Sequence, residues 1–191
     1  MDLLKKSWQR LKILCTKPAA YFSAPAVSLL DGALIIGLLL LATFGQKLAW
    51  QQPGIPGVGF AEALQQAAIN SLLVWSLFSL FFYAIAEIFR KRINFFKLAG
   101  MAGSAGLPVV IVTLFSALTW WIGSSFNLAP IMRPWLLLQN GLSWIGLALG
   151  WPGVGGYLLM REGLKIPQIW AIVICVLTLA VFIASGVFAG A

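Results

Sequence analysis

The chain has 191 residues, of which 61% are hydrophobic and 9% are charged, and its formal net charge is +8. Soluble domains carry roughly 25% charged residues, so this composition excludes an ordinary soluble domain and indicates an integral membrane protein. Because the sequence has no histidine and only two cysteines, Cys15 and Cys175, it predicts neither a disulfide framework nor a metal site.

The positive charge is concentrated beside apolar segments. Five of the 13 cations precede Ala20, and four more lie between Arg90 and Lys97. Cations that flank apolar segments stay on one side of the membrane and attract anionic lipid headgroups. We therefore interpret the net charge as an orientation signal and expect no nucleic-acid partner.

Residues 1–24 form a basic leader. Four side chains with helical spacing make up its predicted apolar stripe: Leu4, Trp8, Leu11 and Cys15. With most of the cations on other faces, this pattern is typical of an amphipathic helix in the headgroup region, which Pro18 should end. A cleaved signal peptide is the alternative, but the basic region is long and the next apolar segment is of spanning length.

Two apolar segments follow the leader, and each is long enough to span a membrane, for which about 20 residues suffice. The first crossing is predicted at residues 27–50 and contains Asp31. A connector at 51–62 is rich in proline and glycine and cannot continue the helix. The second crossing is predicted at 63–89 and returns to the cation cluster through Glu87.

The rest of the chain predicts three further crossings. Residues 98–132 carry no charge; this stretch is too long for one helix and too short for two with a loop, so we place the third crossing at 99–122. The fourth is predicted at 134–160, with a glycine-rich interruption at 150–156 that neighbouring helices can accommodate as a kink. The fifth is predicted at 166–188.

Five crossings alternate sides, and the distribution of cations tests this arrangement. The leader and the loops after the second and fourth crossings carry five, four and two cations, whereas the other face carries Lys47 and Arg133. The N-terminus is therefore predicted to be cytoplasmic and the C-terminus outside. We expect an all-α, polytopic membrane protein in which residues 25–191 form a domain of five transmembrane helices behind the interfacial leader.

Ionisable residues inside a membrane are candidates for function, and the candidates in the crossings or at their ends are Asp31, Glu87 and Arg133. At about 1.5 Å per residue, each lies near a helix end, which argues against a charge-coupled pump. The absence of histidine removes Ser-His, Cys-His and zinc chemistry, and a single intramembrane aspartate cannot form an aspartyl pair. A Ser-Lys pair stays open by composition, although the one lysine within the predicted crossings, Lys47, lies near a helix end as an interface anchor. We expect no enzyme activity and no cofactor.

The charged residues near the predicted cytoplasmic ends are candidates for one surface that binds a partner protein or anionic lipids. They are Asp31, Glu87, Arg90, Lys91, Arg92, Lys97, Arg161 and Lys165. Glu87 precedes Arg90 and Lys91 by three and four residues, so the simpler interpretation of these three is an ion pair on a helix surface.

Small residues in the crossings predict close helix packing, because they let backbones approach. The packing candidates are Gly100, Gly103, Gly106 and Pro108, and Gly37, Gly146 and Gly150 extend the pattern. The alternative is that these faces line a groove for a solute.

Three short motifs are spread over nearly the whole chain. The leader contains Trp8 and then Lys17-Pro-Ala-Ala-Tyr-Phe22, Phe96-Lys97 is followed by Gly103-x-x-x-Leu107-Pro108, and Gly163-Leu-Lys-Ile-Pro167 precedes the fifth crossing. Together they resemble bacterial members of the YIP family, the Ypt-interacting-protein domain proteins. The resemblance implies a helical membrane domain without known chemistry, and eukaryotic members are linked to Rab-type GTPases and vesicle traffic. The chain has no Asp-Leu-Tyr-Gly-Pro motif and a leader of about 24 residues, which favours a prokaryotic inner-membrane protein.

These features predict a non-enzymatic scaffold or accessory subunit of a membrane complex or trafficking process. The expected partners are membrane lipids with anionic headgroups and another membrane protein or a second copy of the chain. The alternative is a transporter or channel for a lipid or a weakly polar solute. A solute path should show a polar cavity that reaches the midplane, whereas a scaffold should show a packed centre with grooves that face lipid or protein.

Overall fold

The computed structural model describes residues 2–25, 27–49, 59–125, 146 and 149–189, and within these ranges it is helical, without a strand. In chain order the elements are α1 (Asp2–Thr16), α2 (Pro18–Ser23), α3 (Leu29–Ala49), α4 (Phe60–Ile88), α5 (Phe95–Ala105), α6 (Leu107–Ser125), α8 (Val154–Leu158), the π-helix η1 (Leu159–Gly163) and α9 (Gln168–Ala189). Three stretches are long and apolar enough to span a membrane: Leu29–Leu48, Phe60–Ile88 and Phe95–Thr119. These helices are those of a membrane protein.

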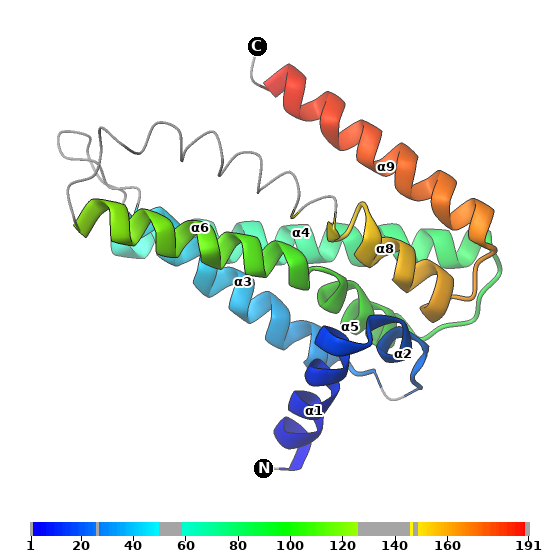
Figure 1. Ribbon diagram of the computed structural model, residues 1–191. Helices are drawn as coiled ribbons and strands as arrows, with labels where there is room; N and C mark the ends of the chain where they lie inside the picture. The colour runs from blue at the N-terminus through cyan, green and yellow to red at the C-terminus, as the bar shows by residue number, and fades with distance from the viewer. Residues whose placement is uncertain (1, 26, 50–58, 126–145, 147–148, 190–191) are drawn as a thin grey trace.

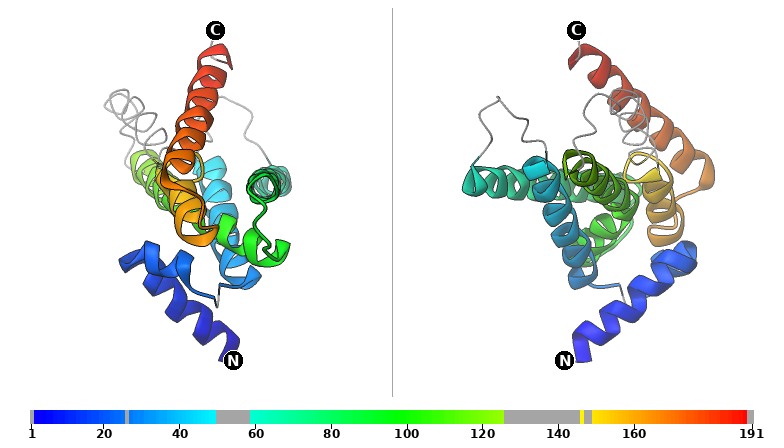
Figure 2. Two further views of the ribbon diagram at one scale, coloured as in Figure 1. Left: turned by 90° about the vertical axis from the view of Figure 1, so that its right-hand side faces the viewer. Right: turned by 60° about the vertical axis from the view of Figure 1, so that its left-hand side comes forward.

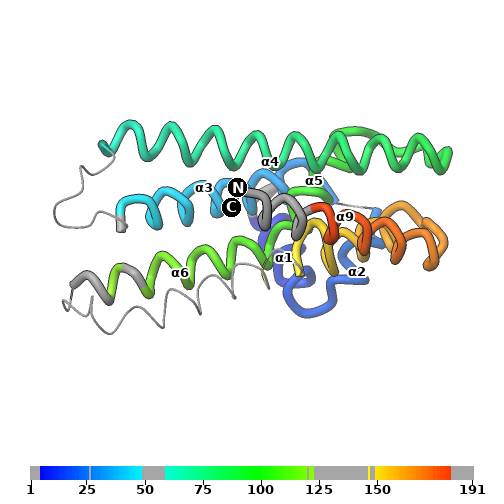
Figure 3. Tube along the Cα trace, turned by 90° about the horizontal axis from the view of Figure 1, so that it is seen from above, coloured from blue at the N-terminus to red at the C-terminus, as the bar shows by residue number. Residues whose placement is uncertain are grey.

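The long helices α3, α4 and α6 run alongside one another (Figure 1, Figure 3). α3 contacts both of the others, and α5 packs against α3 and α4 at one end of the bundle. α1 lies across the direction of α4, as Figure 2 shows, and α2 turns back beside it. α9 leaves the bundle at an angle from its start beside η1 (Figure 1). The leader, α5 and η1 therefore meet at one end of the bundle.

The third spanning stretch is divided into α5 and α6 at Gly106. Pro108 has no N–H to donate to the carbonyl of Ser104, and its ring opposes a regular helix over the preceding turn. The Gly106 N–H bonds to the Gly103 carbonyl at 3.1 Å, which is a tighter turn than that of an α-helix. The glycine-to-proline motif of the sequence is thus a break within one spanning stretch.

The cation turn begins with a Schellman motif at the end of α4. The Lys91 N–H donates to the Ala86 carbonyl at 2.8 Å, and the Arg90 N–H donates to the Glu87 carbonyl at 2.9 Å. Arg90 has a φ of 52°, in the left-handed region that glycine usually supplies at this position. Lys165, after η1, has a φ of 54°. Each turn therefore places a cation where a side chain costs about 1 kcal/mol of backbone strain.

The first three predicted crossings coincide with helices whose ends differ by a few residues. α3 matches the predicted 27–50, and α4 begins at Phe60, three residues before the predicted 63–89. The third begins at Phe95, because Asn94 caps the helix by accepting the Phe96 N–H at 2.8 Å.

The later crossings are described in part. Most of the predicted fourth crossing, 134–160, lies outside the described residues, and its described end is a turn at 150–153 followed by α8 and η1. The predicted fifth crossing, 166–188, corresponds to α9, which begins at Gln168 directly after Pro167.

The leader forms two helices. α1 ends at Thr16, and Pro18 starts α2 at the first helical position, where a missing N–H costs nothing. Of the predicted apolar stripe, Leu11 is buried against the bundle, whereas Trp8 is 61% exposed and Cys15 is also exposed, so their contact with the headgroup region stays a prediction. The buried face carries Ser7, Leu11 and Leu14, because Arg10 turns this face toward α3.

Candidate functional site

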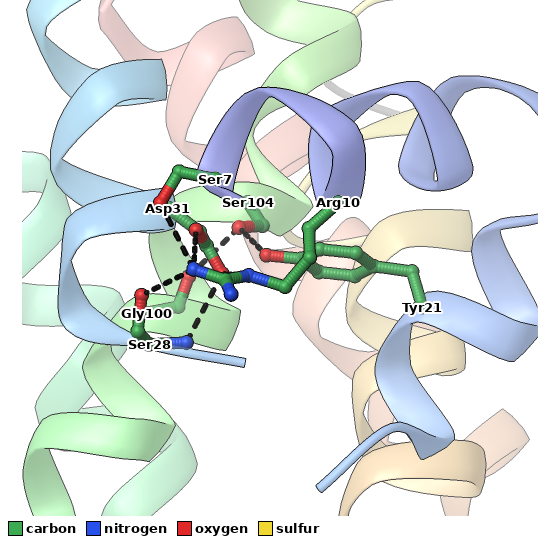
Figure 4. A network of polar contacts seen from close by, with 7 residues as sticks. All are labelled: Ser7, Arg10, Tyr21, Ser28, Asp31, Gly100 and Ser104. Carbon is green, nitrogen blue, oxygen red and sulfur yellow. Dashed lines mark hydrogen bonds and ion pairs between the residues drawn. The ribbon is translucent and has the colours of Figure 1, made fainter. Parts of the chain in front are cut away.

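Arg10 of α1 and Asp31 of α3 form a two-point ion pair where the leader meets the bundle (Figure 4). Arg10 Nε donates to Asp31 Oδ2 at 2.8 Å, and Nη2 donates to Oδ1 at 2.9 Å. The Asp31 side chain has no exposed surface, whereas that of Arg10 is 20% exposed. The hydrogen bond to Asp31 raises the pKa of the Arg10 guanidinium, which keeps the pair charged. The planar guanidinium matches the carboxylate at two points, which a lysine ammonium cannot do.

Two serines complete the coordination of this pair. Arg10 Nη2 also donates to Ser7 Oγ at 2.9 Å and to Ser28 Oγ at 3.1 Å. Asp31 Oδ2 accepts the backbone N–H of Ser28 at 3.0 Å. Because Ser28 directly precedes the first residue of α3, this contact is the acidic half of a capping box, and the negative charge also favours the positive end of the helix dipole. Asp31 therefore both starts α3 and anchors the leader.

Tyr21 extends the polar contacts from α2 to α5. The Tyr21 hydroxyl lies 2.7 Å from Ser104 Oγ, and Ser104 Oγ donates to the Gly100 carbonyl at 2.9 Å. Since the single serine proton is used by Gly100, Tyr21 is the donor in the first contact. Burial raises the pKa of the Tyr21 hydroxyl, so it remains protonated. We refer to Ser7, Arg10, Tyr21, Ser28, Asp31, Gly100 and Ser104 as the polar cluster (Figure 4).

The packing candidates on α5 lie against α3. A Cβ built on Gly103 would lie 2.6 Å from Gly32 Cα, and one on Gly32 would lie 2.6 Å from the Gly100 carbonyl oxygen. A Cβ on Gly100 would overlap the carbonyl of Ser28. Gly37 differs, because nothing lies within 4 Å of a Cβ at that position, so its predicted packing role is wrong. The close contact of α3 with α5 needs Gly32, which the sequence analysis did not single out.

Gly106 makes room for Trp151. Because the Gly106 N–H turns to Gly103, the Ala102 carbonyl is free to accept the Trp151 indole N–H at 2.5 Å. The Trp151 ring stacks on Phe78 of α4 with centroids 5.0 Å apart, and a Cβ on Gly106 would overlap that ring. The break at Pro108 is therefore held by a side chain from the glycine-rich segment.

The residues of the predicted partner surface are divided by the structure. Asp31 is buried in the polar cluster and does not share an exposed face with the others. Seven are exposed or half-buried at the end of α4, in η1, in the turns that follow these two elements and at the start of α5: Glu87, Arg90, Lys91, Arg92, Lys97, Arg161 and Lys165. Lys165 Nζ lies 3.4 Å from Glu162 Oε2. The predicted pairing of Glu87 with Arg90 or Lys91 is not formed, because the left-handed turn at Arg90 leads the chain out of the helix. Arg133 lies outside the described residues.

Sequence reasoning missed most of the polar cluster. It treated Arg10 as one more headgroup cation and gave no role to Ser7, Ser28 or Ser104. One signal was available, because the spacing Ser28-x-x-Asp31 before an apolar run is that of a capping box. No such signal shows which of the five leader cations pairs with Asp31, since the pairing with Arg10 depends on how α2 folds back.

The described residues offer little other chemistry. Within them, no group of three His, Cys, Asp or Glu residues lies close enough to hold a metal ion. At the opposite end of the bundle, Lys47 Nζ donates to Gln66 Oε1 at 2.7 Å and so joins α3 to α4.

Comparisons of the chain with protein-family models, with curated proteins and with solved structures find no match.

Proposed function

We propose that the chain is a non-enzymatic membrane protein of the YIP type, which acts as a scaffold or accessory subunit of a membrane complex. One observation carries the proposal. Both carboxylate oxygens of Asp31 are occupied, by the Arg10 guanidinium and by the Ser28 N–H. A carboxylate held in this way joins helices and is not free to bind a solute or to carry a proton. The buried charge is therefore architectural.

The grooves favour the same proposal over a transporter. One groove, of about 360 Å³, lies among the leader, the break between α5 and α6, and α8, and another lies between α4 and α9. Both are lined almost entirely by apolar side chains. Three described glycines that a solute path would use are closed, Gly100 and Gly103 by α3 and Gly106 by Trp151. A packed centre with apolar grooves is the arrangement expected of a scaffold.

The positions of the three YIP-like motifs also support the proposal. Lys17–Phe22 covers most of α2, the Phe96–Pro108 motif covers most of α5, and Gly163–Pro167 begins at the last residue of η1. Both α2 and α5 contact η1, and Tyr21 of α2 bonds to Ser104 of α5. A Cβ on Gly163 would lie 3.2 Å from Met101 Sδ and 3.7 Å from the Phe22 carbonyl oxygen. Motifs from three distant parts of the chain thus share one region, as parts of a common structural element would.

The proposed arrangement has five crossings in a prokaryotic cytoplasmic membrane, with the N-terminus inside and the C-terminus outside. α3, α4 and the α5–α6 stretch would be the first three crossings, and α9 the fifth. The direction of α1, across α4, suits a helix that lies in the headgroup region (Figure 2). The exposed cations after α4 and η1 would then lie at the cytoplasmic surface.

The test is purification in a mild detergent followed by identification of the proteins that co-purify. If a protein partner binds the exposed cluster, Arg90 and Arg92 make two-point contacts with its carboxylates, which lysine cannot reproduce. We expect the double variant Arg90→Lys/Arg92→Lys to insert normally and to lose a partner that the wild type retains in fixed ratio. The matched variant Lys91→Arg/Lys97→Arg keeps the charge and both arginines, and it should retain the partner. If Arg90→Lys/Arg92→Lys keeps every partner, the exposed cations serve as an orientation signal and no partner protein recognises the arginines.

A further inference from the structure

The groove between α4 and α9 has a volume of about 520 Å³, and its lining includes Phe89, the residue before Arg90. Phe81, Ile85 and Phe89 line it on the α4 side, and Trp170, Ile174 and Leu177 line it on the α9 side. The volume falls within the range of roughly 300–1,000 Å³ found for small-molecule sites. An apolar trough of this size, open along its length, suits a flexible hydrocarbon chain.

One end of the groove has the character of a membrane interface. The rings of Phe89 and Trp170 meet there with centroids 6.2 Å apart, and tryptophan side chains favour the level of the lipid headgroups. Arg90 directly follows Phe89, and Lys165 precedes Trp170 by five residues. These turns and the adjoining ends of α4, α5 and η1 carry six cations and two carboxylates: Arg90, Lys91, Arg92, Lys97, Arg161 and Lys165, with Glu87 and Glu162. The end of the groove is therefore positively charged.

We infer that this groove binds an anionic phospholipid, with an acyl chain between α4 and α9 and the phosphate beside Arg90 and Lys165. The inference rests on the proposed membrane location and adds a specific lipid site to it. Charge complementarity selects this occupant, because an anionic headgroup offsets the cations. A second copy of the chain would bring the same positive turns together, since copies related by an axis along the membrane normal share their orientation.

The test uses the full chain purified in detergent and analysed by native mass spectrometry. Phosphatidylglycerol and phosphatidylcholine with identical acyl chains are added in turn, and the fraction of lipid-bound protein is measured. We expect one bound phosphatidylglycerol, preferred at least tenfold over phosphatidylcholine. Equal binding of the two lipids, or a protein dimer that excludes lipid from the groove, would overturn the inference.

Two pairs of variants separate the groove from the headgroup site. Ile174→Trp fills the groove and should abolish the bound lipid, whereas Val176→Trp adds the same ring at an exposed position of α9 that does not line the groove. Arg90→Gln/Lys165→Gln should keep the acyl contact but bring a tenfold preference for phosphatidylglycerol down to about equal binding of the two lipids, since each surface cation contributes about fivefold. Unchanged binding by Ile174→Trp, or an unchanged preference in the double glutamine variant, would contradict the proposed site.

The variant that tests the protein partner gives a distinct result here. Arg90→Lys/Arg92→Lys keeps every charge, so it should bind phosphatidylglycerol as the wild type does even though it loses a protein partner. Loss of the preference for phosphatidylglycerol in that variant would contradict a site that recognises the headgroup by charge alone. The lipid-binding experiment can therefore contradict the lipid site while the co-purification experiment still supports a protein partner, and the opposite outcome is equally possible.

Discussion

Arg10 and Asp31 lie 21 residues apart in the chain and join the leader to the first long helix through two hydrogen bonds. Replacing both members of a buried ion pair can be nearly neutral, but removing one leaves an unpaired charge where the Asp31 side chain is fully buried. Around this pair, Tyr21 and Ser104 join α2 to α5, and the glycines bring α5 onto α3. The leader is thereby part of the folded core.

Removing one charge of the pair should destabilise the protein strongly. Asp31→Asn keeps the shape of the side chain but leaves the guanidinium without its counter-charge, and we expect a loss of about 3 kcal/mol. The exposed pair Lys165–Glu162 is the matched control, because Glu162→Gln should cost less than about 0.5 kcal/mol. Unfolding in detergent, followed by circular dichroism, measures both. Equal stability of the two variants would show that the buried pair contributes no more than a surface contact.

The glycine contact between α3 and α5 predicts an effect of a single methyl group. Gly103→Ala places a Cβ 2.6 Å from Gly32 Cα, so the two backbones must separate, and the yield and thermal stability of the folded protein should fall. Gly37→Ala is the matched control on α3, because its Cβ meets open space. Alanine favours a helix over glycine by about 1 kcal/mol, so this variant should be neutral or more stable. Unchanged melting of Gly103→Ala would be incompatible with the close contact.

Tyr21 predicts a dependence of stability on alkaline pH. Burial raises its pKa in the folded protein above the unfolded value of about 10. Its contribution to stability is therefore complete below pH 10 and is lost as the pH rises further, because the unfolded chain gives up this proton first, with a slope of at most about 1.4 kcal/mol per pH unit. Tyr21→Phe should lack this slope. Denaturant unfolding between pH 9 and 11 tests the difference, and parallel curves for the two proteins would exclude a buried, protonated Tyr21.

The sequence predicts the helical class and the first three spanning stretches because these depend on the length and composition of apolar runs. Uncharged segments of more than 20 residues have few other structures available. Helix caps can also be recognised from sequence, because the capping residue contacts a neighbour two or three positions away, as Asn94 and the Ser28-x-x-Asp31 spacing show. Such features involve neighbours in the chain.

The polar cluster depends on contacts between distant residues, and a periodic pattern does not contain them. The sequence pattern places Trp8 and Cys15 on a stripe toward the lipid headgroups, but it does not show that Arg10 turns another face toward α3, where the buried Asp31 needs a counter-charge. Glycines likewise look alike in the sequence, although Gly103 lies against a backbone and Gly37 meets open space. The partner of each residue is set by how α2 and α5 fold back onto α3.

The most direct test of the proposed five-crossing arrangement is the accessibility of its two ends. Cys15 is exposed on α1, so a thiol reagent can reach it from the side on which the leader lies. In intact cells that carry the Cys175→Ser background, a membrane-impermeant maleimide should leave Cys15 unlabelled until the membrane is permeabilised, and Ala191→Cys should be labelled at once. Labelling of Cys15 from outside, or protection of a cysteine at position 191, would contradict the arrangement.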